Sequence, residues 1–196
     1  MEITLRHIEK RINNPDLAIW PEKIVLHYIG NPGTTAAQNA SWFATVKSQT
    51  SVNYVVDDES VIELIEPGKK TYGTSSKEAN ESSIQIEMCH PDKTGKPTEK
   101  TLENVIWLVQ RLRNKFGPLE VIRHYDVTGK KCPRWYVEYP DEWEALKARI
   151  FKNYMTVGMA KNIIKERAGL SDETLLFLSF YKYGDDLLIK LARAMK

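Results

Sequence analysis

Residues 24–29 read Ile-Val-Leu-His-Tyr-Ile, and this continuous apolar, β-branched run predicts a strand in the interior of a sheet. Residues 31–33, Asn-Pro-Gly, are typical of a turn and end the strand. Thr34 or Thr35 then caps a helix that is expected to run to about residue 48. This strand, turn and helix set the fold class, and they place the histidine of the run inside the sheet.

Strand and helix patterns alternate through the rest of the first three quarters of the chain. Strands are expected over residues 51–57, 60–65, 83–89 and 121–124, helices over 101–116 and 141–152, and loops over 67–83 and 125–140. The period of two in residues 83–89 puts the apolar side chains on one face and Gln85, Glu87 and Cys89 on the other. Strands interleaved with helices indicate an α/β domain with a central sheet.

The pattern changes after about Met155, where three short helices are expected over residues 160–168, 171–182 and 185–195. The chain is therefore divided into a domain of residues 1–153 and a small helical domain of residues 156–196. Three short helices bury little core by themselves. Several of their apolar residues are expected to dock on a partner surface: Leu175, Leu176, Leu178, Phe180, Leu187, Leu188 and Leu191.

Composition and charge exclude several classes of protein. Of 196 residues, 42% are hydrophobic and 28% are charged, which excludes disordered and collagen-like chains. A net charge of +2 gives no support to binding of nucleic acid or of a membrane surface. No apolar run approaches the roughly 18 residues of a membrane span. The N-terminus lacks the pattern of a secretory signal, so a cytoplasmic location is expected until the protein is released.

The histidines and cysteines differ in their positions. His7 lies in a charged stretch and His90 in a polar loop, and neither is expected to act, whereas His27 lies inside an apolar strand and His124 ends another. Cys132 follows His124 by eight residues. One histidine in a strand is usually structural, but two imidazoles and a thiolate are a ligand set for Zn²⁺ with the fourth position left to water.

Three longer strings carry a family resemblance: residues 24–32 (IVLHYIGNP), 82–89 (SSIQIEMC) and 122–134 (IRHYDVTGKKCPR). They resemble the zinc-dependent N-acetylmuramoyl-L-alanine amidases of phages and prophages, in the superfamily of the peptidoglycan recognition proteins. The resemblance covers about residues 20–152. It implies a central mixed β-sheet flanked by helices, with His27, His124 and Cys132 as zinc ligands.

The same resemblance implies an activity. The substrate is bacterial peptidoglycan, and a zinc-activated water cleaves the amide bond between N-acetylmuramic acid and L-alanine, as in an endolysin. Glu87 matches the family's glutamate, which orients the water or moves its proton. Lys130 matches a lysine before the cysteine and is expected to stabilise the oxyanion. Lys131 is the alternative, more typical of a solvated charge, and Cys89 is expected to be structural, as is His90.

Two departures from the family pattern concern substrate contacts. Related sequences usually carry an aromatic–histidine pair where this chain has Val52-Asn53, and many carry a tryptophan–histidine pair where residues 71–73 read Thr-Tyr-Gly. Valine cannot supply the hydroxyl that assists catalysis in some relatives. The aromatic residues after Cys132 have two interpretations that the sequence leaves open, a wall of the substrate groove or packing against the helix that contains Trp143: Trp135, Tyr136 and Tyr139.

Residues 182–186, Lys-Tyr-Gly-Asp-Asp, resemble part of a small helical domain that some prophage amidases carry. That resemblance implies wall attachment, or self-association into a homo-oligomer, and docking on the catalytic domain is the alternative. Two other functions remain open: a non-catalytic peptidoglycan-recognition module, which would be expected to lose a zinc ligand, and a cytoplasmic amidase that recycles muropeptides. A zinc peptidase of another fold would show an HExxH helix, and the sequence has none.

Overall fold

A six-stranded mixed sheet is the centre of the fold in the computed structural model, which describes residues 1–9, 13–45, 47–152 and 155–195. Its strands are β1 (Ile3–Leu5), β2 (Lys23–Tyr28), β3 (Tyr54–Val56), β4 (Val61–Glu63), β5 (Ser83–Met88) and β6 (Glu120–Arg123). The helices around it are α1 (Ala36–Phe43), α2 (Lys77–Ser82), α3 (Glu99–Phe116), α4 (His124–Thr128), α5 (Arg134–Glu138) and α6 (Pro140–Phe151). The α/β fold predicted from the sequence is confirmed.

The strands lie in the order β1-β4-β3-β5-β2-β6; of these pairs β3–β4 is antiparallel and the others are parallel. In the register of β2 and β5, His27 lies opposite Glu87, and Val25 lies opposite Gln85. Parallel strands bring their carboxyl ends to the same edge of a sheet, where the loops that follow carry functional residues. The polar residues of β2 and β5 therefore meet at this edge.

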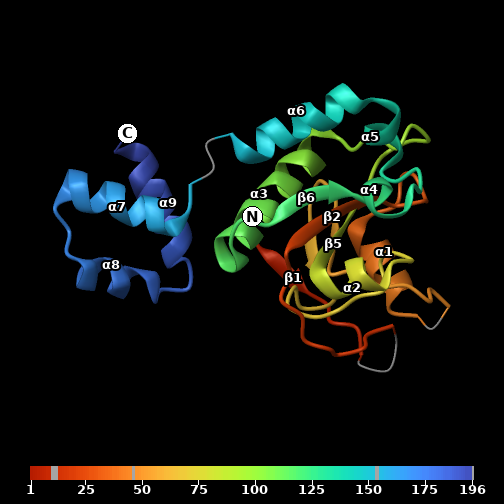
Figure 1. The fold of residues 1–196 in the computed structure, drawn as a ribbon, viewed down its shortest axis with the longest axis horizontal. Helices are drawn as coiled ribbons and strands as arrows, with labels where there is room; N and C mark the ends of the chain where they lie inside the picture. Colours follow the sequence, from red (N-terminus) through yellow and green to blue (C-terminus); the bar gives the residue numbers. More distant parts are fainter. Residues whose placement is uncertain (10–12, 46, 153–154, 196) are drawn as a thin grey trace. The chain divides into compact units, whose positions relative to one another are not determined.

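Different helices pack on the two faces of the sheet. Figure 1 shows α3 and α6 on one side and α1 and α2 on the other. On the α3 side, the main apolar core joins helix side chains such as Leu108 and Trp143 to alternate residues of β2 and β5: Ile24, Leu26, Ile84, Ile86 and Met88. On the α1 side, a smaller cluster joins Ala40, Val55 and Cys89. The alternation predicted for residues 83–89 is confirmed, because Gln85, Glu87 and Cys89 face away from the main core.

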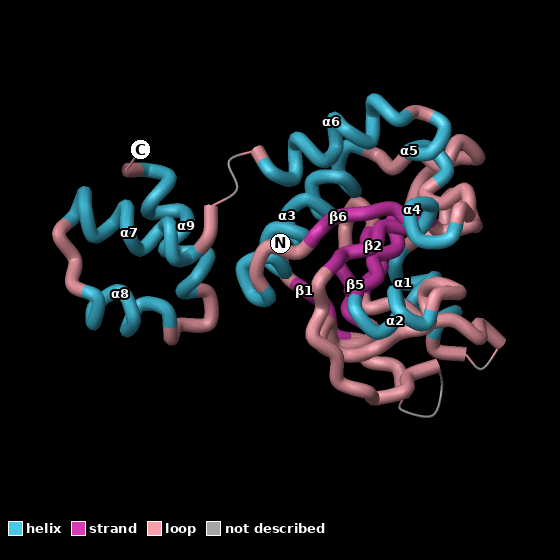
Figure 2. The backbone as a smooth tube through the Cα atoms, viewed as in Figure 1, coloured by secondary structure: helices cyan, strands magenta, loops and turns pink. Residues whose placement is uncertain are grey.

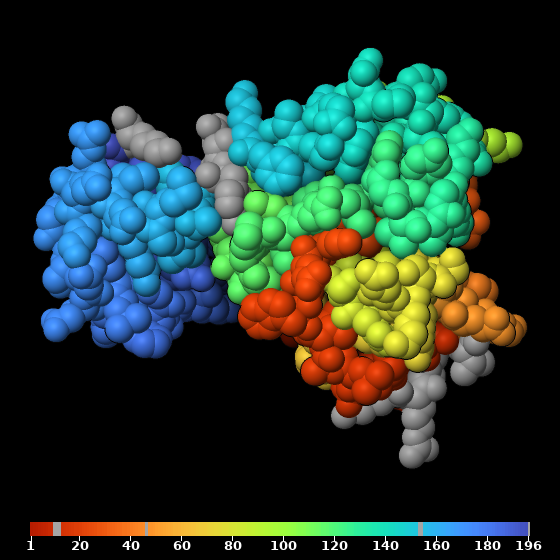
Figure 3. Space-filling model, in the orientation of Figure 1, coloured from red at the N-terminus to blue at the C-terminus, as the bar shows by residue number. Residues whose placement is uncertain are grey.

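The segment that leads into β2 joins distant parts of the chain. The backbone N–H of Glu22 donates to the carbonyl oxygen of Ser82 at 2.8 Å, and the N–H of Glu120 donates to the carbonyl of Glu22 at 3.1 Å. Figure 3 shows the three segments (orange-red, yellow and green) side by side. These bonds align the starts of β2, β5 and β6.

Some expectations about local structure were wrong. The loop expected over residues 67–83 contains α2, whose N-cap Ser76 accepts a hydrogen bond from the N–H of Ala79. The loop expected over residues 125–140 contains α4 and α5. Helix α1 ends at Phe43, five residues before the predicted end, and β1 was not predicted at all. Each missed element has three to six residues, too few for a clear period in the sequence.

Contacts divide the chain into two units, Met1–Ile150 and Phe151–Lys196. The second unit contains α7 (Val157–Ala168), α8 (Asp172–Ser179) and α9 (Gly184–Ala194), and Figure 2 shows only helices and loops in its described part. Gly184 is required at the start of α9, because an added Cβ would meet the carbonyl oxygen of Leu178.

None of the helices in the described part of the chain is long and apolar enough to cross a membrane.

Candidate metal centre

Strands β2 and β5 position three polar side chains on the face of the sheet that α1 covers. His27 and Glu87 are direct neighbours in the parallel register, and Gln85 lies two residues before Glu87 on the same face. His27 is 2% exposed and Gln85 is fully buried. Buried polar side chains need partners, and those of His27 come from beyond the sheet as well as from β5.

His124 and Cys132 reach the same place from the loop that follows β6. That strand ends at Arg123, and His124 is the first residue of α4. The N–H of Tyr125 donates to the carbonyl oxygen of Cys132 at 2.8 Å, which folds the loop back onto the start of α4. One ligand atom from each of His27, His124 and Cys132 lies within 4.8 Å of the other two, and all three residues are buried.

The three donor groups face one another. Sγ of Cys132 lies 3.8 Å from Nδ1 of His27. The imidazole rings of His27 and His124 are 4.6 Å apart, centre to centre, at an angle of 62°. The sequence prediction that these three residues form one group agrees with this geometry.

Burial sets the protonation of all three groups. Burial, together with the neighbouring His124, lowers the pKa of His27 to about 3. It also lowers the pKa of His124 to about 4, with a contribution from the charge of Lys130. Both imidazoles are therefore neutral at neutral pH and keep a free lone pair. Burial raises the pKa of the Cys132 thiol to about 12, so the thiol keeps its proton unless a cation replaces it.

One atom of the group indicates that a metal fits. Nδ1 of His124 is buried and has no hydrogen-bond partner among the described residues. Such an orphan costs free energy in a folded protein unless a ligand satisfies it. Two neutral imidazoles and one thiol are the donor set that suits Zn²⁺, with a further position open to solvent or substrate. The residues present therefore fit a zinc ion.

Glu87 lies next to this group. Its side chain is partly buried, and its Oε2 atom is buried without a hydrogen-bond partner among the described residues. Burial raises the pKa of Glu87 to about 7, and the nearby charge of Lys130 opposes that shift. A carboxyl group with a pKa near 7 can both accept and donate a proton at neutral pH.

Lys130 and Lys131 differ in the groups with which their charges interact. Lys130 is exposed, yet its charge acts on His27, His124 and Glu87. Nζ of Lys131 instead forms an ion pair with Glu138 at 2.5 Å. The charge of Lys130 therefore acts on the donor group, whereas the charge of Lys131 is paired with Glu138.

The other histidines have structural partners. Nε2 of His7 lies 2.8 Å from Oε1 of Glu63. Nε2 of His90 lies 2.5 Å from the carbonyl oxygen of Ile29, and its Nδ1 lies 2.7 Å from that of Asp92. His90 therefore uses both ring nitrogens on the backbone, in agreement with the structural role expected for it.

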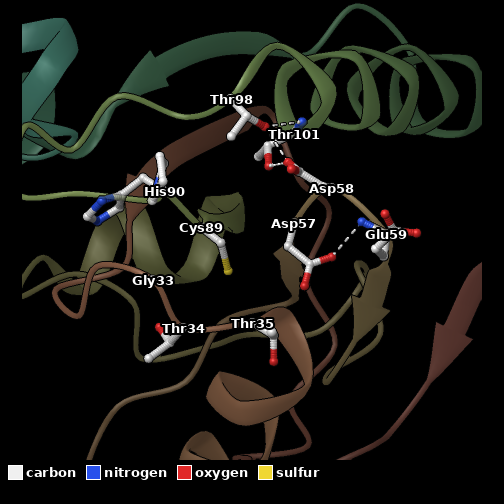
Figure 4. Close-up of a pocket in the computed structure, with 11 residues that line it drawn as sticks. Gly33, Thr34, Thr35, Asp57, Asp58, Glu59, Cys89, His90, Thr98 and Thr101 are labelled. Atoms are coloured by element: carbon white, nitrogen blue, oxygen red, sulfur yellow. Dashed lines mark hydrogen bonds between the residues drawn. The ribbon is translucent and has the colours of Figure 1, made fainter.

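A pocket of about 320 Å³ lies beside the end of β5, and its lining does not include the three donor residues. Figure 4 shows Cys89 directed into this pocket between Thr35 and Asp57, with the imidazole of His90 turned away. The polar groups in it serve the fold: Asp57 accepts from the N–H of Ala36, and Asp58 accepts from two threonine hydroxyls. The side-chain amide of Asn39 lies 3.6 Å from Sγ of Cys89. Structural bonds thus account for these groups.

The residues at the first departure from the family pattern, Val52-Asn53, have structural tasks. Val52 packs in the apolar cluster on the α1 side. Asn53 is fully buried, and its side-chain amide donates to the carbonyl oxygens of Ile65, Glu66 and Lys69. It holds the loop after β4 and contributes no group to the metal centre.

The aromatic residues after Cys132 divide between the two interpretations. Tyr136 is buried, and its ring lies 5.9 Å from that of Trp143, as the packing interpretation predicted. The ring centres of Trp135 and Tyr139 lie 4.0 Å apart, and Nζ of Lys96 lies 4.6 Å from the centre of the Trp135 ring. Tyr139 is 46% exposed. Tyr139 therefore remains available at the surface.

Sequence reasoning missed Gln85 as a site residue. Its Oε1 lies 2.6 Å from Nε2 of His27. The strand pattern placed Gln85 on the correct face, but nothing in the sequence indicated that its amide contacts a histidine on another strand.

The described residues thus combine a mixed sheet with a buried His-His-Cys group whose donors suit Zn²⁺. The family model for N-acetylmuramoyl-L-alanine amidase matches residues 17–135. The chain belongs to this family of zinc-dependent hydrolases, as the sequence strings predicted.

Curated relatives agree with this assignment. The chain is 28% identical over 144 residues to the N-acetylmuramoyl-L-alanine amidase CwlL of Bacillus licheniformis, a match that covers 65% of this chain and 40% of that protein. It is also 28% identical over 144 residues to the amidase XlyA of Bacillus subtilis (strain 168), which covers 70% of this chain and 47% of XlyA. The chain thus spans about two fifths to one half of the length of these relatives.

Solved structures show the same fold. The catalytic domain of XlyA matches with a TM-score of 0.68 and 26% identity, over 76% of this chain and 99% of that domain. The structure of PlyL matches with a TM-score of 0.69 at 22% identity, over 76% of this chain and 97% of that one, and supports the fold alone. These solved structures confirm the mixed sheet flanked by helices.

Proposed function

We propose that this chain hydrolyses bacterial peptidoglycan at the amide bond between N-acetylmuramic acid and L-alanine, as an endolysin-type amidase that needs zinc. The observation that carries the proposal is the convergence of His27, His124 and Cys132 in a chain that belongs to the amidase family. Relatives named N-acetylmuramoyl-L-alanine amidases support the substrate class.

His27, His124 and Cys132 are the residues that would hold the zinc ion. When bound, zinc lowers the pKa of a water molecule and polarises the carbonyl group of the substrate. The two imidazoles supply neutral donors without losing a proton, whereas Cys132 gives up its proton on binding. A buried site also strengthens the electrostatic interactions within it.

Glu87 and Lys130 are the residues that would act on the substrate. Glu87 takes a proton from the attacking water and delivers it to the nitrogen of L-alanine as the amide bond breaks, which suits a carboxyl group with a pKa near 7. The ammonium group of Lys130 stabilises the negative charge on the oxygen of the tetrahedral intermediate. Lys130 is exposed and can approach a bound glycan peptide from solvent.

The two rival functions receive less support. A recognition module without turnover needs neither a buried His-His-Cys group nor a carboxyl oxygen without a hydrogen-bond partner, and the described part of this chain has both. An amidase that recycles soluble muropeptides would use the same centre. The similarity to a structure of a mutant endolysin from Bacillus subtilis favours action on the cell wall, and we propose that the protein reaches the wall after release from the cytoplasm.

The helical unit is proposed to attach the enzyme to the wall or to join copies of it. Its core is small, and its large aromatic side chains stay exposed, including Phe177 (61%), Phe180 (78%) and Tyr181 (59%). Deletion of residues 156–196 keeps the whole of α6, so the first unit should fold and remain active on soluble fragments. We expect weaker sedimentation with cell walls, or a changed oligomeric state by light scattering. A truncated protein with normal wall binding and an unchanged oligomeric state would contradict this part of the proposal.

Product analysis tests the proposed reaction. Purified peptidoglycan is digested with the zinc-loaded protein, and new amino groups and new reducing sugar ends are measured separately. The proposal predicts free amino groups on L-alanine and no new reducing ends. New reducing ends would indicate a glycosidase, and new amino groups on other residues would indicate a peptidase.

A further inference from the structure

A chain of hydrogen bonds lies behind His27, on the side away from Cys132. Oε1 of Gln85 lies 2.6 Å from Nε2 of His27, and Nε2 of Gln85 donates to Oγ of Ser83 at 2.7 Å. The Ser83 hydroxyl donates in turn to the carbonyl oxygen of Ala79 at 2.5 Å. Ser83 and Gln85 are fully buried, so water does not compete for these bonds.

The direction in which each hydrogen bond of this series is donated is fixed. A backbone carbonyl oxygen only accepts hydrogen bonds, so the single proton of the Ser83 hydroxyl is used on Ala79. Ser83 must then accept from Gln85, which turns the amide nitrogen of Gln85 toward Ser83 and its oxygen toward His27. Because an amide oxygen cannot donate, Nε2 of His27 has to carry the ring proton.

The consequence falls on the other ring nitrogen of His27. A neutral imidazole has one proton, so Nδ1 keeps a lone pair, and this atom faces Sγ of Cys132 at 3.8 Å. The carbonyl oxygen of Ala79 thus decides, through two side chains, which nitrogen of His27 is free.

The space for the Gln85 side chain depends on Gly73. A Cβ atom at position 73 would lie 2.9 Å from Cγ and from Oε1 of Gln85, closer than real Cβ contacts. In this chain, the missing side chain at position 73 makes room for the amide that reaches His27.

We propose that Gln85 is a positioning residue, oriented by Ser83, that fixes His27 as an Nδ1 ligand of the metal centre. This inference rests on the proposed zinc site. Outer partners of ligating histidines set the tautomer and the ring orientation, and their loss typically lowers metal affinity by about 10- to 100-fold. Gln85 touches neither the substrate nor the metal in this role.

The test uses the full chain and two readouts, the zinc dissociation constant from chelator competition and the tautomer of His27 from nitrogen NMR of the metal-free protein. In the unaltered protein, His27 should carry its proton on Nε2. Gln85→Met keeps the length of the side chain but removes the acceptor, so both tautomers should appear and zinc should bind about 10- to 100-fold more weakly. Gln85→Glu keeps an oxygen toward His27 and should restore the Nε2–H tautomer and most of the affinity.

Two further variants separate positioning from general destabilisation. Ile84→Val removes one methylene group from the other face of the same strand, so it should lower stability without changing the tautomer or the affinity. Ser83→Ala keeps Gln85 but frees its amide to turn, so a mixture of tautomers is expected. This variant also provides the test if Gln85→Met does not fold.

The outcomes distinguish this inference from the proposed function. If the unaltered protein binds no zinc, or Cys132→Ser binds it equally well, the zinc site itself is wrong. If zinc binding depends on Cys132 but Gln85→Met and Ser83→Ala keep the affinity and the Nε2–H tautomer, the positioning role of Gln85 is overturned and the zinc site stands.

Discussion

The two cysteines of the chain show how similar burial leads to different chemistry. Cys132 is 3% exposed and Cys89 is 4% exposed, and burial raises the pKa of both thiols to about 12. In Cys132 the negative charge of Glu87 adds to this shift, and in Cys89 the charge of Asp57 does so. Neither thiol is a reactive nucleophile at neutral pH as it stands.

The two cysteines differ in the residues that surround them. Cys132 faces two neutral imidazoles, one of which has a buried nitrogen without a partner among the described residues. Cys89 packs among apolar side chains, and the amide of Asn39 is its polar neighbour. A buried thiol becomes a metal ligand only where other donors converge on it, so the difference between the two sites lies in what surrounds the sulfur atom.

The largest expected effect comes from Cys132→Ser. Loss of an outer partner alone lowers metal affinity by about 10- to 100-fold, so loss of a ligand should lower it by more than about 100-fold. We expect zinc content, measured by atomic absorption, to fall well below one ion per chain and lytic activity to fall with it. Full activity in this variant would show that Cys132 is not a zinc ligand and that the two cysteines do not differ in this respect.

The next effect concerns Glu87→Ala. Glu87 supplies proton transfer and no ligand, so the variant should keep its zinc while its turnover falls by about 10²- to 10⁴-fold. Glu87→Gln is the matched control for shape and should be equally inactive, because its amide cannot take up the proton. Full activity in either variant would make Glu87 a structural residue.

A smaller loss is expected for Lys130→Ala, with Lys131→Ala as its control. Removal of one donor to an oxyanion costs about 10²- to 10³-fold in turnover, and the exposed Lys130 should fall at or below the lower end of that range. Lys131 forms an exposed ion pair with Glu138, which contributes less than about 1 kcal/mol. Equal losses in the two variants, measured as initial rates on peptidoglycan, would contradict the assignment of the oxyanion role to Lys130.

The smallest effect is expected for Cys89→Ala. This variant should keep one zinc ion per chain and nearly full activity, and lose only about 1 kcal/mol of unfolding free energy for the truncated side chain in the apolar cluster. In the native zinc-loaded protein, iodoacetamide should leave Cys89 unmodified until denaturant exposes it. A loss of zinc in this variant would give Cys89 a role in the metal centre.

The sequence was sufficient for the parts of the site that depend on strand pattern. The apolar run around His27 and the alternation around Glu87 placed both residues correctly, because a period of two fixes the face on which a side chain lies. Helices α4 and α5 were expected as loop, because a helix of five residues shows little more than one turn of the pattern.

Gln85 could not be predicted as part of the site, for a different reason. Its task depends on the orientation of an amide, and that orientation is set by a hydroxyl on the same strand and a carbonyl oxygen in α2. It depends also on the absence of a side chain at Gly73, in another loop. Such a relation among three separate segments leaves no pattern in any one of them.

X-ray absorption at the zinc edge tests the central claim most directly, because it counts the ligands of the metal in the unaltered protein, in Cys132→Ser and in Cys89→Ala. We predict one sulfur ligand at about 2.3 Å and nitrogen ligands at about 2.0–2.1 Å in the unaltered protein. The sulfur ligand should persist in Cys89→Ala and disappear in Cys132→Ser. A sulfur ligand that survives in Cys132→Ser, or is lost in Cys89→Ala, would contradict the zinc centre of His27, His124 and Cys132.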